Sequence, residues 1–155
     1  FVAATGDLPS PRYKPSLAVV NNRLYMFGGQ QFDYYTKGRT MYELDLATLS
    51  WTTRDDPSAP LRALFGFAGD DEGKRLFLFG GIEDILALLS GQMPVVRNDV
   101  FQYNLASGTW SPLNATGELP PPSFFSCMGY RHNYLYLIVA ITMGGMPPSL
   151  INMHF

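Results

Sequence analysis

One seven-residue phrase occurs twice in this chain and constrains its fold more than any other feature. It reads RLYMFGG from Arg23 to Gly29 and RLFLFGG from Arg75 to Gly81, 52 residues later. A short apolar run bounded by turn signals is typical of a β-strand buried on both faces. Paired glycines indicate a backbone that turns through positive φ or passes close to a neighbour. The repetition therefore predicts successive copies of one β unit.

The residues around the first phrase predict a four-stranded antiparallel meander. Asn21-Asn22 makes a two-residue hairpin turn between the phrase and the apolar run before it. Beyond the glycines, a polar loop from Gln30 to Arg39 leads to an alternating run. The strands are expected at Ser16–Val20, Arg23–Phe27 and Met41–Leu46, with a fourth that begins at Trp51 and ends near Arg54.

The second phrase lies within the same order of elements. Its strands are expected at Ala63–Ala68, Arg75–Phe79, Val100–Leu105 and around Trp110, with an acidic hairpin loop at Gly69–Lys74. The loop Ile82–Asn98 is longer than its counterpart. Ile82, Ile85, Leu86 and Leu89 would share one helical face there, with Gly91 as a cap. We expect a helical turn or two that covers its own sheet edge or docks a partner.

A third unit opens at Gly117–Ser123 (GELPPPS), 111 residues after the similar Gly6–Arg12 (GDLPSPR). Phe124–Tyr130 is its expected first strand, and the second begins at Tyr134. Either LYL (135–137) or AITM (140–143) takes the usual register before the displaced pair Gly144-Gly145. Leu150–Phe155 repeats the pattern of a third strand, so the unit is expected to be incomplete.

The composition excludes several classes of function. The 155 residues carry a net charge of −2, with no basic stripe, so no nucleic-acid partner is expected. The longest apolar run, Tyr134–Met143, is about half of what a bilayer span needs, so no membrane partner is expected either. A single cysteine, Cys127, excludes an intrachain disulfide and is expected to be a buried, inert thiol.

The order of these elements resembles the kelch repeat: a proline-arginine start, an apolar strand, a double glycine, a tyrosine strand and a tryptophan. The resemblance implies an all-β fold, a partial kelch-type β-propeller of four-stranded antiparallel blades. Blades are expected at about 6–55 and 56–113, with an incomplete third at 114–155. The family's packing positions match Gly28, Gly29, Tyr42, Trp51, Gly80, Gly81 and Trp110, while Phe101 replaces the tyrosine and Ser123 stands where Arg12 stands.

The sequence shows no convergent catalytic or metal-binding chemistry. His132 falls in an expected turn and His154 in a terminal strand, without partners at ligand spacing, so neither a metal nor a cofactor is expected. The acidic clusters Asp70-Asp71-Glu72 and Asp55-Asp56 are expected in solvated turns. Asn114-Ala115-Thr116 is a glycosylation sequon, relevant only in a secreted protein.

The loop from Gln30 to Arg39 is the predicted partner-binding site. Its aromatic and cationic side chains resemble the composition of binding hot spots. The alternative is that the tyrosines pack against the next blade. The candidate residues are Phe32, Tyr34, Tyr35, Lys37 and Arg39.

We therefore expect a non-catalytic protein-binding scaffold that presents inter-strand loops to a protein partner. The alternative is the propeller portion of an enzyme whose catalytic residues lie outside these residues. Relatives of the resembled family include copper oxidases and iron-dependent nitrile-forming proteins. The first residue is Phe1 and no leader is visible, so a longer parent is expected and the compartment stays open, the cytoplasm slightly favoured.

The repeat also predicts two uncovered apolar faces, one on the first unit and one on the third. Monomeric soluble proteins rarely expose patches of this size. We expect these residues alone to self-associate, aggregate or require the remaining blades.

Overall fold

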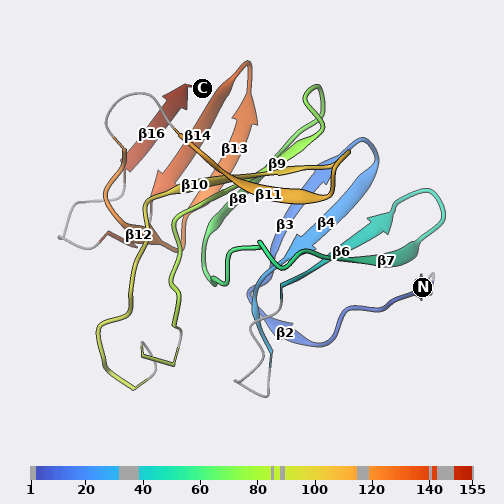
Figure 1. Cartoon of the computed structure of the whole chain (residues 1–155), viewed down its shortest axis with the longest axis horizontal. Coiled ribbons are helices and arrows are strands. Elements are labelled where there is room, and N and C mark those ends of the chain that lie inside the picture. Colours follow the sequence, from blue (N-terminus) through green and yellow to red (C-terminus); the bar gives the residue numbers. More distant parts are fainter. Residues whose placement is uncertain are drawn as a thin grey trace.

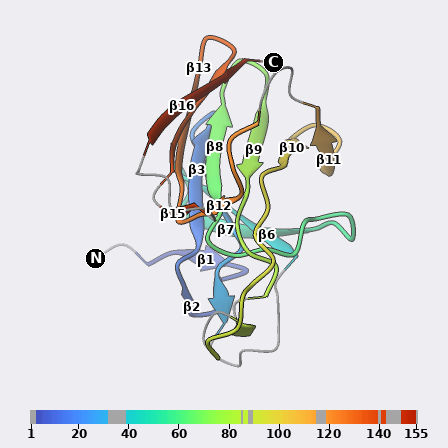
Figure 2. The same cartoon turned by 90° about the vertical axis from the view of Figure 1, so that its left-hand side faces the viewer.

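The described residues form three larger β-sheets that stand side by side as successive blades of a partial β-propeller, together with two two-stranded sheets (Figure 1). The computed structural model describes residues 3–31, 39–84, 86–87, 90–114, 119–139, 141–142 and 149–154. Figure 2 shows the first strands of the sheets, β3, β8 and β13, near one another when the molecule is turned by 90°. The all-β expectation is confirmed.

The first sheet has the strand order β1-β7-β6-β4-β3. Its antiparallel strands are β3 (Ser16–Val20), β4 (Arg23–Phe27), β6 (Thr40–Asp45) and β7 (Ser50–Asp55), and β1 (Thr5–Gly6) adds to β7 in parallel. Asn21 and Asn22 both have positive φ, 49° and 59°, as a two-residue hairpin turn requires. The predicted four-strand meander is confirmed, and the short β1 was not predicted.

The second sheet consists of β8 (Gly66–Asp70), β9 (Arg75–Phe79), β10 (Val100–Asn104) and β11 (Thr109–Leu113). The prediction of its first strand was three residues too early. Leu64 has φ 62°, so the backbone cannot continue as an extended strand from Ala63. Ala63 instead forms an isolated bridge with Ile82.

The third sheet consists of β13 (Cys127–Arg131), β14 (Tyr134–Val139) and β16 (Ser149–His154). The prediction that its first strand begins at Phe124 was wrong, because Phe125 has φ 56° and an extended strand cannot continue through it. Ser123–Phe124 forms a separate strand, β12, paired with β15 (Ile141–Thr142). The open question of register is answered by β14, in which LYL pairs with β13 and β16.

Besides the β12–β15 pair, two smaller features lie outside the three larger sheets. β2 (Arg12–Tyr13) pairs with β5 (Gln30–Gln31) beside the first sheet. In the long loop, residues 86–87 are helical, the Ser90 amide donates to the Leu86 carbonyl at 2.9 Å, and Gly91 has φ 76°. The expected helical turn therefore exists, but Ile82 is not part of it, since this residue bridges to Ala63 and Val96. Residues 85, 88 and 89 lie outside the described residues.

The two larger core clusters lie at the contacts between neighbouring sheets, and a smaller one is formed by Ala63, Leu64, Ile82 and Phe124. Between the first and second sheets, Phe27 packs against Phe65, Phe67 and Trp110, with the Phe27 and Trp110 ring centroids 5.0 Å apart. Between the second and third sheets, Phe77 stacks on Tyr130 with centroids also 5.0 Å apart. The second sheet is thus covered on both faces, as its continuous apolar strands predicted.

Three predictions about solvent exposure were wrong. Asp70 and Asp56, expected in solvated turns, are buried. Hydrogen bonds compensate for the lost water: Asp70 accepts from Arg75. Asp56 accepts from the amide and hydroxyl of Ser58 and from the Trp110 amide. Cys127, expected to be buried, is exposed, since β13 presents alternate residues to a face that no described sheet covers. Asp71 and Glu72 are exposed as expected.

Candidate protein-binding surface

The two ends of the sheets differ in the length of their connections. One end, the hairpin end, carries only short turns, at residues 21–22, 46–49, 71–74, 105–108 and 132–133. The long connections, between β4 and β6, β7 and β8, β9 and β10, and β11 and β13, all leave from the opposite end, which we call the loop face (Figure 1). Long connections on a rigid scaffold are where binding residues usually lie.

An arginine fixes the backbone of the loop face in the first sheet. Arg12 donates from Nη1 to the Gly28 carbonyl at 3.0 Å, and its guanidinium lies 4.7 Å from the centroid of the Tyr42 ring. Gly28 has φ 67°, and a Cβ there would lie 2.6 Å from the Phe65 ring. Two features therefore require glycine at position 28: the positive φ and the close approach of the Phe65 ring.

The second sheet has an equivalent arginine, Arg62, which sequence reasoning missed. Arg62 donates to the Gly80 carbonyl at 3.3 Å, forms an ion pair with Asp99 and lies over the Phe101 ring at 5.1 Å. A signal was present in the sequence, because Arg62 lies two residues after Pro60 and precedes its glycine pair, as Arg12 lies directly after Pro11 and precedes the first pair. These two arginines hold the backbone in place where the long loops leave β4 and β9.

Only one of the predicted site residues can be placed. Phe32, Tyr34, Tyr35 and Lys37 lie outside the described residues. Arg39 is exposed and donates a hydrogen bond to the Pro57 carbonyl. The exposed cation of the predicted site therefore lies beside the connection between β7 and β8.

Arg39 also acts on the neighbouring carboxylate of Asp56. Burial alone would raise the pKa of Asp56. Hydrogen bonds from Ser58 and from the Trp110 amide, together with the charge of Arg39, outweigh burial and hold this pKa below its ordinary value. Asp56 is thus a fixed negative group that ties the loop face to the last strand of the second sheet.

Three equivalent residues at the starts of the sheets share an unusual backbone conformation. Lys14, Leu64 and Phe125 each lie two residues before β3, β8 and β13, with φ of 46°, 62° and 56°. Left-handed conformations of this kind are costly for residues other than glycine. Because it recurs in all three repeats, the conformation belongs to the scaffold, and each repeat differs only in the side chain that it presents.

These residues bring a cation and two aromatic rings together on the loop face. The Lys14 Nζ lies 3.8 Å from the centroid of the Phe125 ring and 5.4 Å from that of Tyr13. Tyr13 is 56% exposed and pairs with Gln30, one residue before the end of β5. Among the described residues, no carboxylate forms an ion pair with Lys14. We call Tyr13, Lys14 and Phe125 the aromatic–lysine cluster.

Sequence reasoning missed the aromatic–lysine cluster because its members come from the starts of two different repeats. Tyr13-Lys14 was visible as an aromatic beside a cation, but nothing in the sequence placed Phe125 next to it. The cluster lies where β2 leads into the first sheet, beside β5, which ends at Gln31 just before the predicted binding loop.

The part of the chain that the structure describes holds no group of three or more histidine, cysteine or acidic side chains placed to bind a metal ion. His132 lies in a hairpin turn and His154 at the end of β16, as expected. No helix within the described residues is long and apolar enough to cross a bilayer.

Comparison with known proteins identifies the repeat. Residues 2–145 match the model of the KLHDC2/KLHL20/DRC7 Kelch-repeats domain. The chain belongs to the kelch-repeat family. The arginine, double glycine and aromatic contacts described above are thus the packing of kelch blades.

Named kelch proteins and one enzyme are among the similar sequences. The chain is 25% identical over 144 residues to an N-(sulfonatooxy)prop-2-enimidothioate sulfolyase of Thlaspi arvense, covering 91% of this chain and 39% of that protein. It is 27% identical to Kelch domain-containing protein 10 of Xenopus tropicalis, covering 79% and 31%. It is 32% identical to the Rho GTPase-activating protein gacHH of Dictyostelium discoideum, covering 74% and 7%.

The chain spans well under half the length of each of these relatives. Among solved structures, YjhT aligns with a TM-score of 0.62 at 24% identity, over 84% of this chain and 34% of that one. This likeness concerns the fold alone. It agrees with the arrangement of sheets as kelch-type propeller blades.

Proposed function

We propose that this kelch module is a non-catalytic scaffold that binds a protein partner through its loop face. The aromatic–lysine cluster carries the proposal: Lys14 lies over Phe125 beside the exposed ring of Tyr13, without an ion-pair partner among the described residues. Tyrosine, as in the exposed Tyr13, is one of the side chains that most often dominate the energy of protein interfaces. Arg12 and Arg62 hold the backbone at the same end of the sheets through their hydrogen bonds to Gly28 and Gly80. This preorganisation lowers the entropic cost of binding.

The chemistry of the cluster also specifies the partner. An unpaired ammonium group favours a carboxylate, and the rings beside it favour an apolar side chain. We therefore expect a partner segment that places an acidic group next to a large apolar one. The predicted loop residues Phe32, Tyr34, Tyr35, Lys37 and Arg39 would extend the same surface, because β5 leads from the cluster into that loop.

Peptide selection tests the proposal. The protein is immobilised and used to select from a random-peptide phage library, and the Kd of the best peptide is measured for each variant. Lys14→Ala, and the triple replacement of Tyr34, Tyr35 and Arg39 by alanine, should each weaken binding at least about tenfold. The melting temperature should stay within a degree or two of the wild-type value, as expected for surface substitutions.

Lys74→Ala is the matched control, because Lys74 is an exposed lysine with positive φ at the opposite, hairpin end. This variant should bind the peptide like the wild type. If only Lys74→Ala weakened binding, the site would lie at the hairpin end. A large loss of stability in the triple variant would show that its side chains pack the blade instead.

The second candidate function is the propeller portion of an enzyme, either a metal-dependent oxidase or a protein of the nitrile-forming type. The similarity to the sulfolyase supports it. In that case the catalytic groups would lie outside these 155 residues. Elemental analysis of the purified full-length protein distinguishes the two candidates, since stoichiometric copper or iron would favour the enzyme and a consistent absence of both metals would favour the scaffold.

A further inference from the structure

A cavity lies between the first and second sheets at the hairpin end, opposite the loop face. Its volume is about 420 Å³, within the range of small-molecule sites. The first hairpin with β4 and two turns of the second sheet line it, through Asn21, Arg23, Tyr25, Lys74, Leu105 and Ala106. These lining residues include two cations and no carboxylate.

The cavity lies at an interface that lacks one aromatic ring. Tyr25 and Phe77 occupy the same position of the repeat, since each lies two residues after the arginine that begins its strand. At the second interface the Tyr130 ring stacks on Phe77. At the first interface Gly69 takes the position of Tyr130. No ring from that position can cover Tyr25, and the cavity lies beside it.

Tyr25 supplies a hydroxyl group without a partner. The residue is 3% exposed, and its hydroxyl forms no hydrogen bond with any residue that the structure describes. Burial and the nearby charge of Glu43 raise the pKa of Tyr25 above its ordinary value, so the hydroxyl keeps its proton. A donor with so little access to water gains from an acceptor on a ligand.

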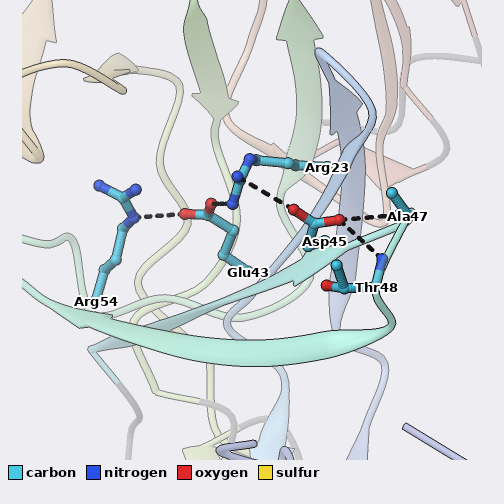
Figure 3. A network of polar contacts seen from close by, with 6 residues as sticks. All are labelled: Arg23, Glu43, Asp45, Ala47, Thr48 and Arg54. Atoms are coloured by element: carbon cyan, nitrogen blue, oxygen red, sulfur yellow. Dashed lines mark hydrogen bonds and ion pairs between the residues drawn. The ribbon is translucent and has the colours of Figure 1, made fainter. Parts of the chain in front are cut away.

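Two cations lie beside this hydroxyl. Arg23 is held between Glu43 and Asp45, with Nη2 3.2 Å from Asp45 Oδ2, and the hydrogen bond to Glu43 raises the pKa of Arg23 (Figure 3). The two carboxylates fix the guanidinium and offset its charge. Lys74 is exposed and forms no ion pair among the described residues. Its charge is therefore free to pair with a ligand.

We propose that this cavity binds a small organic monocarboxylate with an apolar body. The carboxylate would accept hydrogen bonds from the Tyr25 hydroxyl and the Lys74 ammonium group, beside the N–H groups of Arg23. The apolar body would lie on Leu105 and Ala106. Because the aromatic–lysine cluster lies at the opposite end of the sheets, this site is separate from the proposed protein-binding surface.

The charges around the cavity favour a monoanion over a dianion. The charge of Arg23 is already offset, so the lining offers one unpaired cation, Lys74. The buried Glu43 carboxylate lies next to Arg23, and water screens its repulsion of a second negative charge only weakly. A phosphate dianion should therefore bind more weakly than a carboxylate.

Ligand-observed NMR titrations of the full-length protein test the proposal. The probes are isocaproate and hydrocinnamate, an aliphatic and an aromatic monocarboxylate. At least one should bind saturably with a Kd of about 1 mM or below, as expected of so few atoms. The corresponding amide, with the same shape and no charge, should bind about tenfold more weakly.

Two variants remove the proposed donors. Tyr25→Phe deletes only the hydroxyl and should raise the Kd of the carboxylate about tenfold. Lys74→Ala should raise it by a similar factor and should remove most of the difference between carboxylate and amide. Arg131→Ala is the control for charge, because Arg131 is exposed at the hairpin end of the third sheet, and it should leave the Kd unchanged.

A matched pair at Ala106 tests the charge of the lining. Ala106→Glu adds a negative charge and should abolish binding, whereas Ala106→Gln, of the same size, should retain most of it. Ala106 and Lys74 are both exposed, so these variants should fold even if Tyr25→Phe does not. Lys74→Ala should still bind a peptide selected at the loop face, which separates the two sites.

Three results would overturn the proposal. The first is the absence of saturable binding of both probes up to about 10 mM, the weak end expected of such small ligands. The second is carboxylate binding that neither Lys74→Ala nor Ala106→Glu weakens, which would place the ligand elsewhere. The third is inorganic phosphate that binds more tightly than either probe and depends on Lys74, which would assign the cavity to another class of ligand.

Discussion

The two interfaces between neighbouring sheets use the same repeat positions but place their charges differently. Between the first and second sheets, the buried Glu43 side chain lies between Arg23 and Arg54, with Arg54 Nε 2.5 Å from Oε2 (Figure 3). Glu43 comes from β6, and the arginines come from the strands on either side of it. The carboxylate thus links three strands of the first sheet, on the face that packs against the second sheet.

The other interface has an amide where the first has a carboxylate. Gln102 takes the position of Glu43, and it contacts Ser111 at 3.4 Å rather than an arginine. The charge lies instead on Asp70, which accepts from Arg75 at 2.8 Å, while Arg75 also reaches the Tyr130 hydroxyl of the third sheet at 3.4 Å. The comparison shows that a blade interface tolerates one buried carboxylate at more than one place, provided that a neighbouring strand supplies an arginine.

Aromatic packing also differs between the two interfaces. Phe27, Tyr103 and Trp110 are all buried in the first interface, and burial raises the pKa of Tyr103. Its hydroxyl has no hydrogen-bond partner among the described residues. The second interface relies mainly on aliphatic side chains such as Leu135 and Leu137, with the stacked pair Phe77 and Tyr130.

The largest expected effect comes from the tryptophans, which occupy equivalent positions on covered and uncovered faces. Trp110 is 5% exposed between the first and second sheets, so Trp110→Ala should lower the free energy of unfolding by about 3–5 kcal/mol. Trp51 is only half-buried, so Trp51→Ala should cost about 1–3 kcal/mol. Denaturant melts measure both. Equal losses would show that the outer face of the first sheet is covered in solution.

A smaller effect should separate the two buried carboxylates. Glu43→Gln imitates the second sheet, leaves Arg54 without its charge partner and leaves Arg23 paired with Asp45 alone, so it should cost about 2–3 kcal/mol. Asp70→Asn affects one arginine and should cost about 1–2 kcal/mol. Measuring unfolding free energies at low and high salt checks this, since the difference should shrink with salt. A larger loss of unfolding free energy in Asp70→Asn than in Glu43→Gln would show that the carboxylate of the second interface contributes more to stability.

The smallest effect is the pH dependence from Asp56. Its pKa is held below the ordinary value, so it stabilises the fold above that value, and the stabilisation is lost as the pH falls through the lowered pKa. The unfolding free energies of wild type and Asp56→Asn should therefore differ most near pH 7 and converge as the pH is lowered through the acid range. A constant difference across this range would assign the role of Asp56 to packing.

The repeat phrases determined most of the fold without any tertiary information. The apolar runs ending in glycine pairs located β4 and β9 correctly, because strand periodicity and positive φ are local properties. The same holds for the hairpin at Asn21-Asn22. The start of β8 was misplaced because nothing local in Ala63–Phe65 shows that Leu64 adopts a left-handed conformation.

What only the tertiary structure decided concerns contacts between repeats. Asp56 is buried because Trp110, from the next sheet's last strand, donates to it, and Cys127 is exposed because its face of the third sheet has no described neighbour. Lys14 meets Phe125 although the two are far apart in the sequence. A sequence pattern records which residues alternate along one strand, but burial and partnership depend on which sheet packs against which face, and only the folded chain contains that information.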